Sequence, residues 1–124
     1  MVRLKVERNA VFEMATLRKN KSGLPVNLYL DDVGSYKSGG HGPRIKFQPN
    51  KGNSPNTRCM IPMTISDSPY IPVPNYKQQL DGIGDSEIAT IKSFIVLNKD
   101  ILLRLCDSED EYDFSDFVSD MKKV

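Results

Sequence analysis

The sequence predicts an α+β domain: a mostly antiparallel sheet of four or five strands, with one long helix packed on one face. Three observations lead to this prediction. Several short segments alternate apolar and polar residues with the period of a half-buried strand. Stretches dense in Gly, Pro, Asn and Ser separate these segments, as turns and loops do. One longer segment, residues 85–105, repeats apolar residues at helical spacing.

The first two predicted strands lie near the amino terminus. Val2, Leu4 and Val6 alternate with charged residues, which is typical of a strand with one buried face. Residues 10–17 show a weaker pattern that fits either a second strand or a short helix, and we prefer the strand. Residues 18–23 contain Asn, Ser and Gly and are expected to form a turn.

Two further strands are expected at residues 24–30 and 44–48, on either side of a central loop. Both alternate in the same way, so each should turn apolar side chains to one face of the sheet and polar ones to the other. The expected apolar faces consist of Val26, Leu28, Leu30, Ile45 and Phe47, opposite Asn27, Tyr29, Arg44, Lys46 and Gln48.

Prolines shape the next segment. Residues 58–66 have strand character, but Pro62 cannot donate to a ladder and therefore predicts an edge position or a bulge. Three prolines in residues 68–76 impose an extended path without a regular ladder, so we expect a strap lying across the core.

The long helix is expected to begin at Asp85, a good N-cap residue, with Glu87 placing negative charge in the first turn. Asn98 falls on the apolar stripe of this helix. The helix is therefore expected to bend there, or to break in two near residues 98–100, because Asn and Asp are good caps.

The charge distribution divides the chain into a domain of residues 1–106 and an acidic extension of residues 107–124. The first part carries 15 Lys and Arg against 9 Asp and Glu, and the second carries 2 against 7. Phe114 and Phe117 interrupt the acidic run at helical spacing, so a short helix or a tail that orders on contact both fit. The tail could fold over the basic loop, dock on a partner protein or stay solvated. In a self-contained domain its rings would instead pack on the sheet, which we favour.

The length of 124 residues fits one small domain with a real core, and a charged content of 27% suits a soluble protein. No hydrophobic leader or membrane-spanning run is visible, so we expect a cytoplasmic protein. Cys59 and Cys106 lack metal-ligand spacing, and no disulfide, metal or cofactor is expected.

The candidate site is the glycine-rich loop of residues 31–48. Its spacing fails the phosphate-binding loop motif, because Gly40 and His41 stand where Lys and Ser or Thr are needed. Backbone amides and cations of such a loop could still bind an anion or nucleic acid, with a tyrosine for base stacking. No acidic residue occurs between Asp32 and Asp67. The candidate binding residues are Tyr36, Lys37, His41, Arg44, Lys46, Lys51 and Arg58.

We therefore expect a non-enzymatic binding protein that engages nucleic acid or a partner protein through this basic loop face. Two alternatives stay open. His41, with Arg44 and Lys46 on the phosphate, could serve a small toxin-like endoribonuclease. The acidic tail could instead be a protein-binding module. The sequence leaves the partner and the oligomeric state open.

Three stretches carry a resemblance to a known family: residues 28–31, residues 40–47 and residues 97–103. They resemble a small bacterial family of unknown function with a His-x-Pro-Pro-His-x-His-Val motif on a strand and Asn-Lys/Arg-x-x-Leu-Leu on a helix. This chain keeps His41 and Pro43 of that motif and carries Arg44 and Lys46 in the same stretch. The resemblance implies a role beside toxin–antitoxin or mobile-element genes, as a phage or mobile-element regulator or inhibitor.

Overall fold

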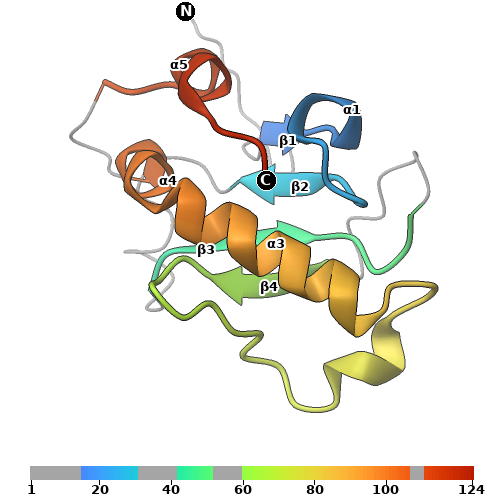
Figure 1. Cartoon of the computed structure of the whole chain (residues 1–124). Coiled ribbons are helices and arrows are strands. Elements are labelled where there is room, and N and C mark those ends of the chain that lie inside the picture. Colours follow the sequence, from blue (N-terminus) through green and yellow to red (C-terminus); the bar gives the residue numbers. More distant parts are fainter. Residues whose placement is uncertain (1–14, 31–41, 52–59, 107–110) are drawn as a thin grey trace, which may run out of the picture.

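In the part of the chain that the structure describes, four antiparallel strands form one sheet, in the order β1-β2-β3-β4 (Figure 1). The computed structural model describes residues 15–30, 42–51, 60–106 and 111–124. The strands are β1 (Ala15–Leu17), β2 (Leu28–Leu30), β3 (Arg44–Phe47) and β4 (Ile61–Thr64). The α+β class and the antiparallel sheet are confirmed. The strand expected at residues 2–6 lies outside the described residues.

Among the described residues, the helices follow the strands, apart from one short helix between β1 and β2. They are α1 (Lys19–Ser22), the 3-10 helix η3 (Tyr76–Gln79), α3 (Asp85–Leu97), α4 (Lys99–Cys106) and α5 (Phe114–Asp120). Helix α3 lies across one face of the sheet (Figure 1). None of the helices in the described parts of the chain is long and apolar enough to cross a membrane.

The core lies between the sheet and the helices. The expected alternation of β3 is confirmed, because Ile45 and Phe47 are buried while Arg44 and Lys46 are only partly so. In β2 the polar-face residue Tyr29 is buried as well as the apolar-face residues. Burial therefore extends to the second face of the sheet at this strand.

Strand β4 forms one edge of the sheet, as Pro62 predicted. The proline-rich strap follows it and touches this edge at one point. The Thr64 N–H donates to the carbonyl of Tyr70 at 3.0 Å, and the Tyr70 N–H donates to Thr64 Oγ1 at 3.0 Å. Pro69 is buried and Ile71 packs against the core. The strap thus covers part of an edge that would otherwise present unpaired backbone groups.

The prediction of one long helix is corrected to two helices that meet at Asn98. Asn98 is the C-cap of α3, and its side-chain Nδ2 donates to the carbonyl of Phe94 at 3.0 Å. The backbone carbonyl of Asn98 then accepts from the N–H of Leu102 within the next helix, at 2.9 Å. An asparagine side chain can form hydrogen bonds with backbone groups that lose their helical partners at a helix end. The helix can therefore break at Asn98 while the apolar stripe continues into α4.

The helix begins at Asp85 as expected, but its N-cap is the preceding residue and not Asp85 itself. Gly84 is the N-cap of α3, and Asp85 is the first helical residue. The carboxylate of Glu87 accepts the N–H of Gly84 at 2.9 Å. A side chain at the third helical position therefore satisfies the N-cap donor, so the cap itself needs no side chain.

The described part of the acidic tail belongs to the core. Helix α5 begins after Asp113, whose side chain accepts the N–H of Asp116 at 2.9 Å. Phe117 is fully buried in the same apolar cluster as the sheet residues, and Phe114 packs against that cluster. The short C-terminal helix is confirmed, and one of its two rings completes the core.

Candidate functional site

The predicted binding residues divide into three groups. Tyr36, Lys37, His41 and Arg58 lie outside the described residues. Arg44 and Lys46 stand two positions apart on β3, so both project from the face opposite the apolar residues Ile45 and Phe47. Lys51 follows beyond the other end of the strand.

Arg44 is the first residue of β3, where this strand pairs with the end of β4. Arg44 is opposite Thr64 in the register, and one residue further the Ile65 N–H donates to the Pro43 carbonyl at 3.1 Å. A pocket of about 420 Å³ opens at this point. Its lining comes from the start of β3, the end of β4 and the strap: Gly42, Pro43, Arg44, Thr64, Ile65, Ser66, Tyr70 and Pro72.

The Nε atom of Arg44 is buried and has no hydrogen-bond partner among the residues that the structure describes. Leaving a buried donor unsatisfied costs about 1–3 kcal/mol, and more when the group is charged. Most buried polar groups in proteins avoid this cost. An unsatisfied guanidinium N–H beside a pocket is therefore a candidate donor for a ligand.

The hydroxyl groups of Thr64 and Ser66 lie 3.3 Å apart on the wall of the same pocket. Thr64 Oγ1 also accepts from the Tyr70 N–H. A hydrogen bond between two hydroxyls uses one hydroxyl hydrogen and leaves the other able to donate. The pair can therefore offer one further donor near Arg44.

Tyr70 supplies an aromatic surface to the pocket. Its side chain is 58% exposed, although its backbone is held to β4 through Thr64. The backbone of Tyr70 is already fixed, so less conformational entropy is lost when a ligand binds to its exposed ring. No acidic side chain lines this pocket in the described part of the chain. The site combines cationic and hydroxyl donors with a flat apolar surface.

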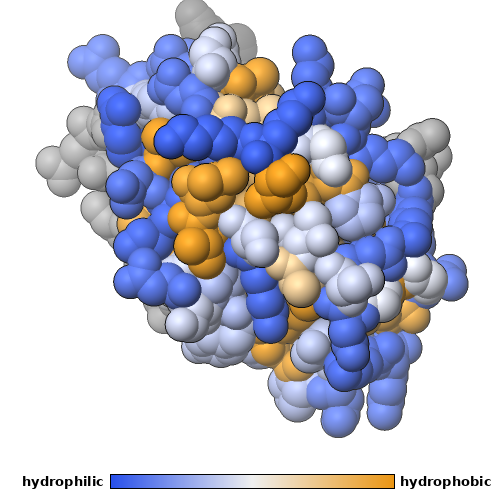
Figure 2. Space-filling view, in the orientation of Figure 1, coloured by the Kyte–Doolittle hydropathy of each residue, from blue (hydrophilic) through white to orange (hydrophobic). Residues whose placement is uncertain are grey.

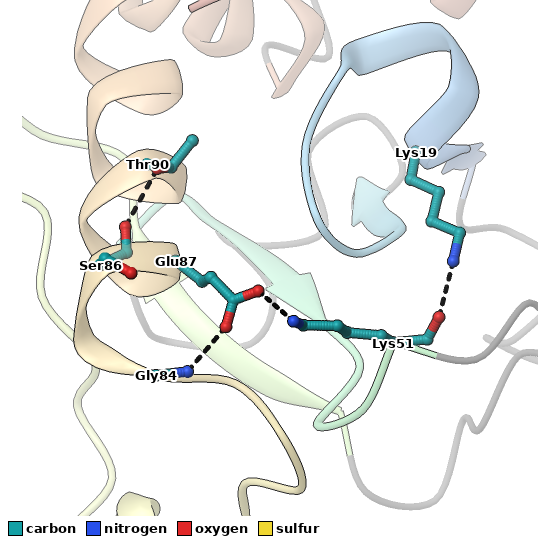
Figure 3. Close-up of polar contacts among 6 residues, drawn as sticks. All are labelled: Lys19, Lys51, Gly84, Ser86, Glu87 and Thr90. Carbon is teal, nitrogen blue, oxygen red and sulfur yellow. Dashed lines mark hydrogen bonds and ion pairs between the residues drawn. The ribbon is translucent and has the colours of Figure 1, made fainter.

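Lys51 has a different environment from Arg44 (Figure 3). Its ammonium group forms an ion pair with Glu87 in the first turn of α3, and its carbonyl accepts Lys19 Nζ at 2.6 Å. The Lys51 contact, followed by the Gly84 N–H, lowers the pKa of Glu87. Lys51 thus ties α1 to the start of α3, and the structure does not bring it to the pocket of Arg44.

Apolar side chains gather on the surface beside the C-terminal end of the chain (Figure 2). Val96, Leu97 and Val124 are each close to half exposed there, and Lys92 and Ser93 complete a shallow hollow. The hollow offers apolar area with one cation at its border. It lacks the unsatisfied buried donor that marks the pocket of Arg44.

Sequence reasoning identified Arg44 but missed Thr64, Ser66 and Tyr70. These residues belong to β4 and to the strap, and no spacing rule links them to Arg44. The one available signal was Tyr70 itself, an aromatic residue between Pro69 and Pro72 in a segment expected to be extended. Prolines hold such a segment open and leave an intervening ring exposed.

Comparisons with known proteins give no relative from which a function could be transferred. No protein-family model matches the chain, and no curated protein or solved structure matches it significantly.

Proposed function

We propose that this chain is a small non-enzymatic binding protein that engages nucleic acid through Arg44 and Lys46 on β3. The observation that carries the proposal is the buried Nε of Arg44, which lacks a hydrogen-bond partner in the described parts of the chain. Phosphate oxygens accept hydrogen bonds from guanidinium groups well, because both partners are charged.

The position of Lys46 supports the same proposal. It is two residues from Arg44 on the same face of β3 and is partly buried, with Pro62 and Tyr29 as its register neighbours. Arg44 and Lys46 lie about 7 Å apart along β3, because each residue advances a β-strand by about 3.4 Å. One nucleic-acid strand could therefore contact both cations through its phosphates. A partner protein with an acidic surface is the competing class of ligand.

The experiment compares binding of a fluorescein-labelled single-stranded oligonucleotide to the wild type and to Arg44→Ala, Lys46→Ala and the double variant. Each variant should weaken binding and flatten its dependence on salt, the slope of log K against log salt falling by roughly one per phosphate contact removed. Lys77→Ala is the matched control, since Lys77 is exposed on η3 and pairs with Asp85.

Equal binding by all variants would remove the proposal. Tighter binding of an acidic peptide than of the oligonucleotide, with the same dependence on Arg44, would assign the face to a partner protein instead. A role as a phage or mobile-element regulator or inhibitor is part of the proposal, and it rests only on the resemblance carried by residues 28–31, 40–47 and 97–103.

A further inference from the structure

We infer that the pocket between Arg44 and Tyr70 is a subsite for one nucleotide of a single strand. In it, a phosphate binds Arg44 and the base stacks on Tyr70. This inference rests on the proposed function and deepens it by naming the unit that is recognised. It assigns a ligand-contacting role to Tyr70, Thr64 and Ser66.

The pocket combines a guanidinium group with two hydroxyl groups as hydrogen-bond donors. Arg44, Thr64 and Ser66 all line the pocket, and the Nε–H of Arg44 is buried without a partner among the described residues. Together they offer two kinds of donor and no carboxylate, a combination that suits an anionic oxygen and disfavours a cation. An anion at this point would relieve the cost of the buried, unsatisfied guanidinium N–H.

The other wall of the pocket is formed by a tyrosine and by prolines. Tyr70 is 58% exposed, and Pro43 and Pro72 line the same pocket. Bases stack on aromatic side chains with little dependence on sequence, because every base has a flat face. The volume of about 420 Å³ falls in the range of small-ligand pockets, roughly 300–1,000 Å³.

A subsite with a stacking ring favours single-stranded over duplex nucleic acid. A base can stack on a protein ring only when it has left the stack of its own helix, as in loops, bulges and single strands. A duplex would meet Arg44 through its phosphates but could not place a base on Tyr70. The subsite therefore predicts that single strands bind more tightly than duplexes of the same length.

Rigidity of the strap strengthens the assignment. The Tyr70 backbone both donates to and accepts from Thr64, and the neighbouring Pro69 is buried. Stacking partners that are already fixed lose less entropy on binding than mobile ones do. The backbone from which the ring projects is thus placed by the fold before a ligand arrives.

The test measures binding of a short single-stranded oligoadenylate with 2-aminopurine at one position, by anisotropy and by quenching of the 2-aminopurine. Tyr70→Ala should weaken binding by about 5- to 150-fold and abolish quenching. Tyr70→Phe should keep both. Tyr76→Ala is the matched control, because Tyr76 is a partly exposed tyrosine on η3 that does not line the pocket.

The outcomes separate the subsite from the proposed function. If Arg44→Ala weakens binding while Tyr70→Ala behaves like Tyr76→Ala, nucleic-acid binding stands and the subsite is wrong. If neither substitution changes binding, both ideas are wrong. Equal affinity for single strand and duplex would also overturn the subsite. Arg44→Lys gives a further check, since a lysine keeps the charge but loses the Nε–H donor and should restore only part of the affinity.

Discussion

The side-chain amide of Asn98 forms two hydrogen bonds with the backbone of Lys122. The Lys122 N–H donates to Asn98 Oδ1 at 2.7 Å, and Asn98 Nδ2 donates to the Lys122 carbonyl at 2.8 Å. A side chain at the junction of α3 and α4 thereby holds the segment that follows α5. Asn98 is 2% exposed, so these bonds are shielded from water.

Replacing Asn98 with Ala should lower the free energy of unfolding by about 2–4 kcal/mol. The substitution removes three hydrogen bonds of a buried amide and leaves backbone groups of Lys122 and Phe94 with fewer partners. Urea unfolding followed by circular dichroism measures the change. Gln78→Ala, at an exposed position of η3, is the control and should change stability little. A loss as small as that of the control would show that water replaces the amide.

Replacing Phe117 with Ala should lower the free energy of unfolding by about 3–5 kcal/mol, because the ring is fully buried in the core. Phe114→Ala is the matched comparison and should lower the free energy of unfolding by less, since Phe114 is only partly buried.

Burial of Phe117 also predicts that deleting residues 107–124 exposes the core. A truncated chain as stable as the full one would contradict this and would favour the tail as a separate binding module.

The Glu87–Lys51 ion pair should make stability depend on pH in the acidic range. The pKa of Glu87 is lowered in the folded state from its ordinary value of 4.5. The stabilisation is therefore complete above that value and is lost as the pH falls through the lower folded pKa. Glu87→Gln should flatten the fall of the unfolding midpoint below about pH 4.5, whereas Glu111→Gln, in the exposed tail, should not. An unchanged profile in Glu87→Gln would mean that other carboxylates cause the acid sensitivity.

Tyr112 should ionise well above the ordinary tyrosine pKa of 10.0. Burial, followed by its hydrogen bond to Asp120, raises its pKa to about 12, and the hydroxyl donates to Asp120 Oδ2 at 2.7 Å. A raised pKa favours the neutral phenol, so its stabilising effect is present below pH 10 and is lost as the pH rises toward 12. Ultraviolet absorbance of tyrosinate should show this late step in the wild type. The step should persist in Tyr76→Phe and disappear in Tyr112→Phe, and its persistence in Tyr112→Phe would contradict the assignment.

Arg44→Met should leave stability unchanged or raise it, by up to about 1–3 kcal/mol, because it replaces an unsatisfied buried donor with an apolar side chain of similar length. Arg104→Met is the contrasting variant. Its guanidinium lies 4.1 Å from the centre of the Tyr112 ring, and its loss should destabilise. Thermal unfolding compares the two. Destabilisation by Arg44→Met would indicate a structural role for Arg44 and weaken the binding proposal.

The sequence indicated those strands in which apolar and polar residues alternate, because this pattern depends only on neighbouring residues. Ile45 and Phe47 are buried and Arg44 and Lys46 are less so, because the period of two along a strand is set by the backbone itself. Pro62 likewise predicted an edge strand, since a missing N–H excludes it from a central ladder. For the helix, Asn98 marked the position of the break before the structure showed it.

The candidate site was predictable only in part. Arg44 stood out as a cation beside a glycine-rich stretch, but Lys51 carries the same charge and is engaged by Glu87 instead. Charge alone does not distinguish a cation that binds a ligand from one that joins two elements of the fold. The distinction depends on which carboxylate lies nearby, and that follows from how β3 and α3 pack.

Residues 18–23, expected to form a turn, contain the short helix α1. The sequence by itself determined which side chains are apolar, and it indicated the alternation of β3 and the helix that begins at Asp85. These properties depend on neighbours a few residues away. The tertiary structure alone decided that Tyr70 shares a pocket with Arg44, that Phe117 rather than Phe114 is the fully buried ring of the tail, and that Asn98 holds Lys122. Each of these contacts joins residues more than ten positions apart. No local preference specifies such pairs, and they form only when burial of the whole core brings the elements together.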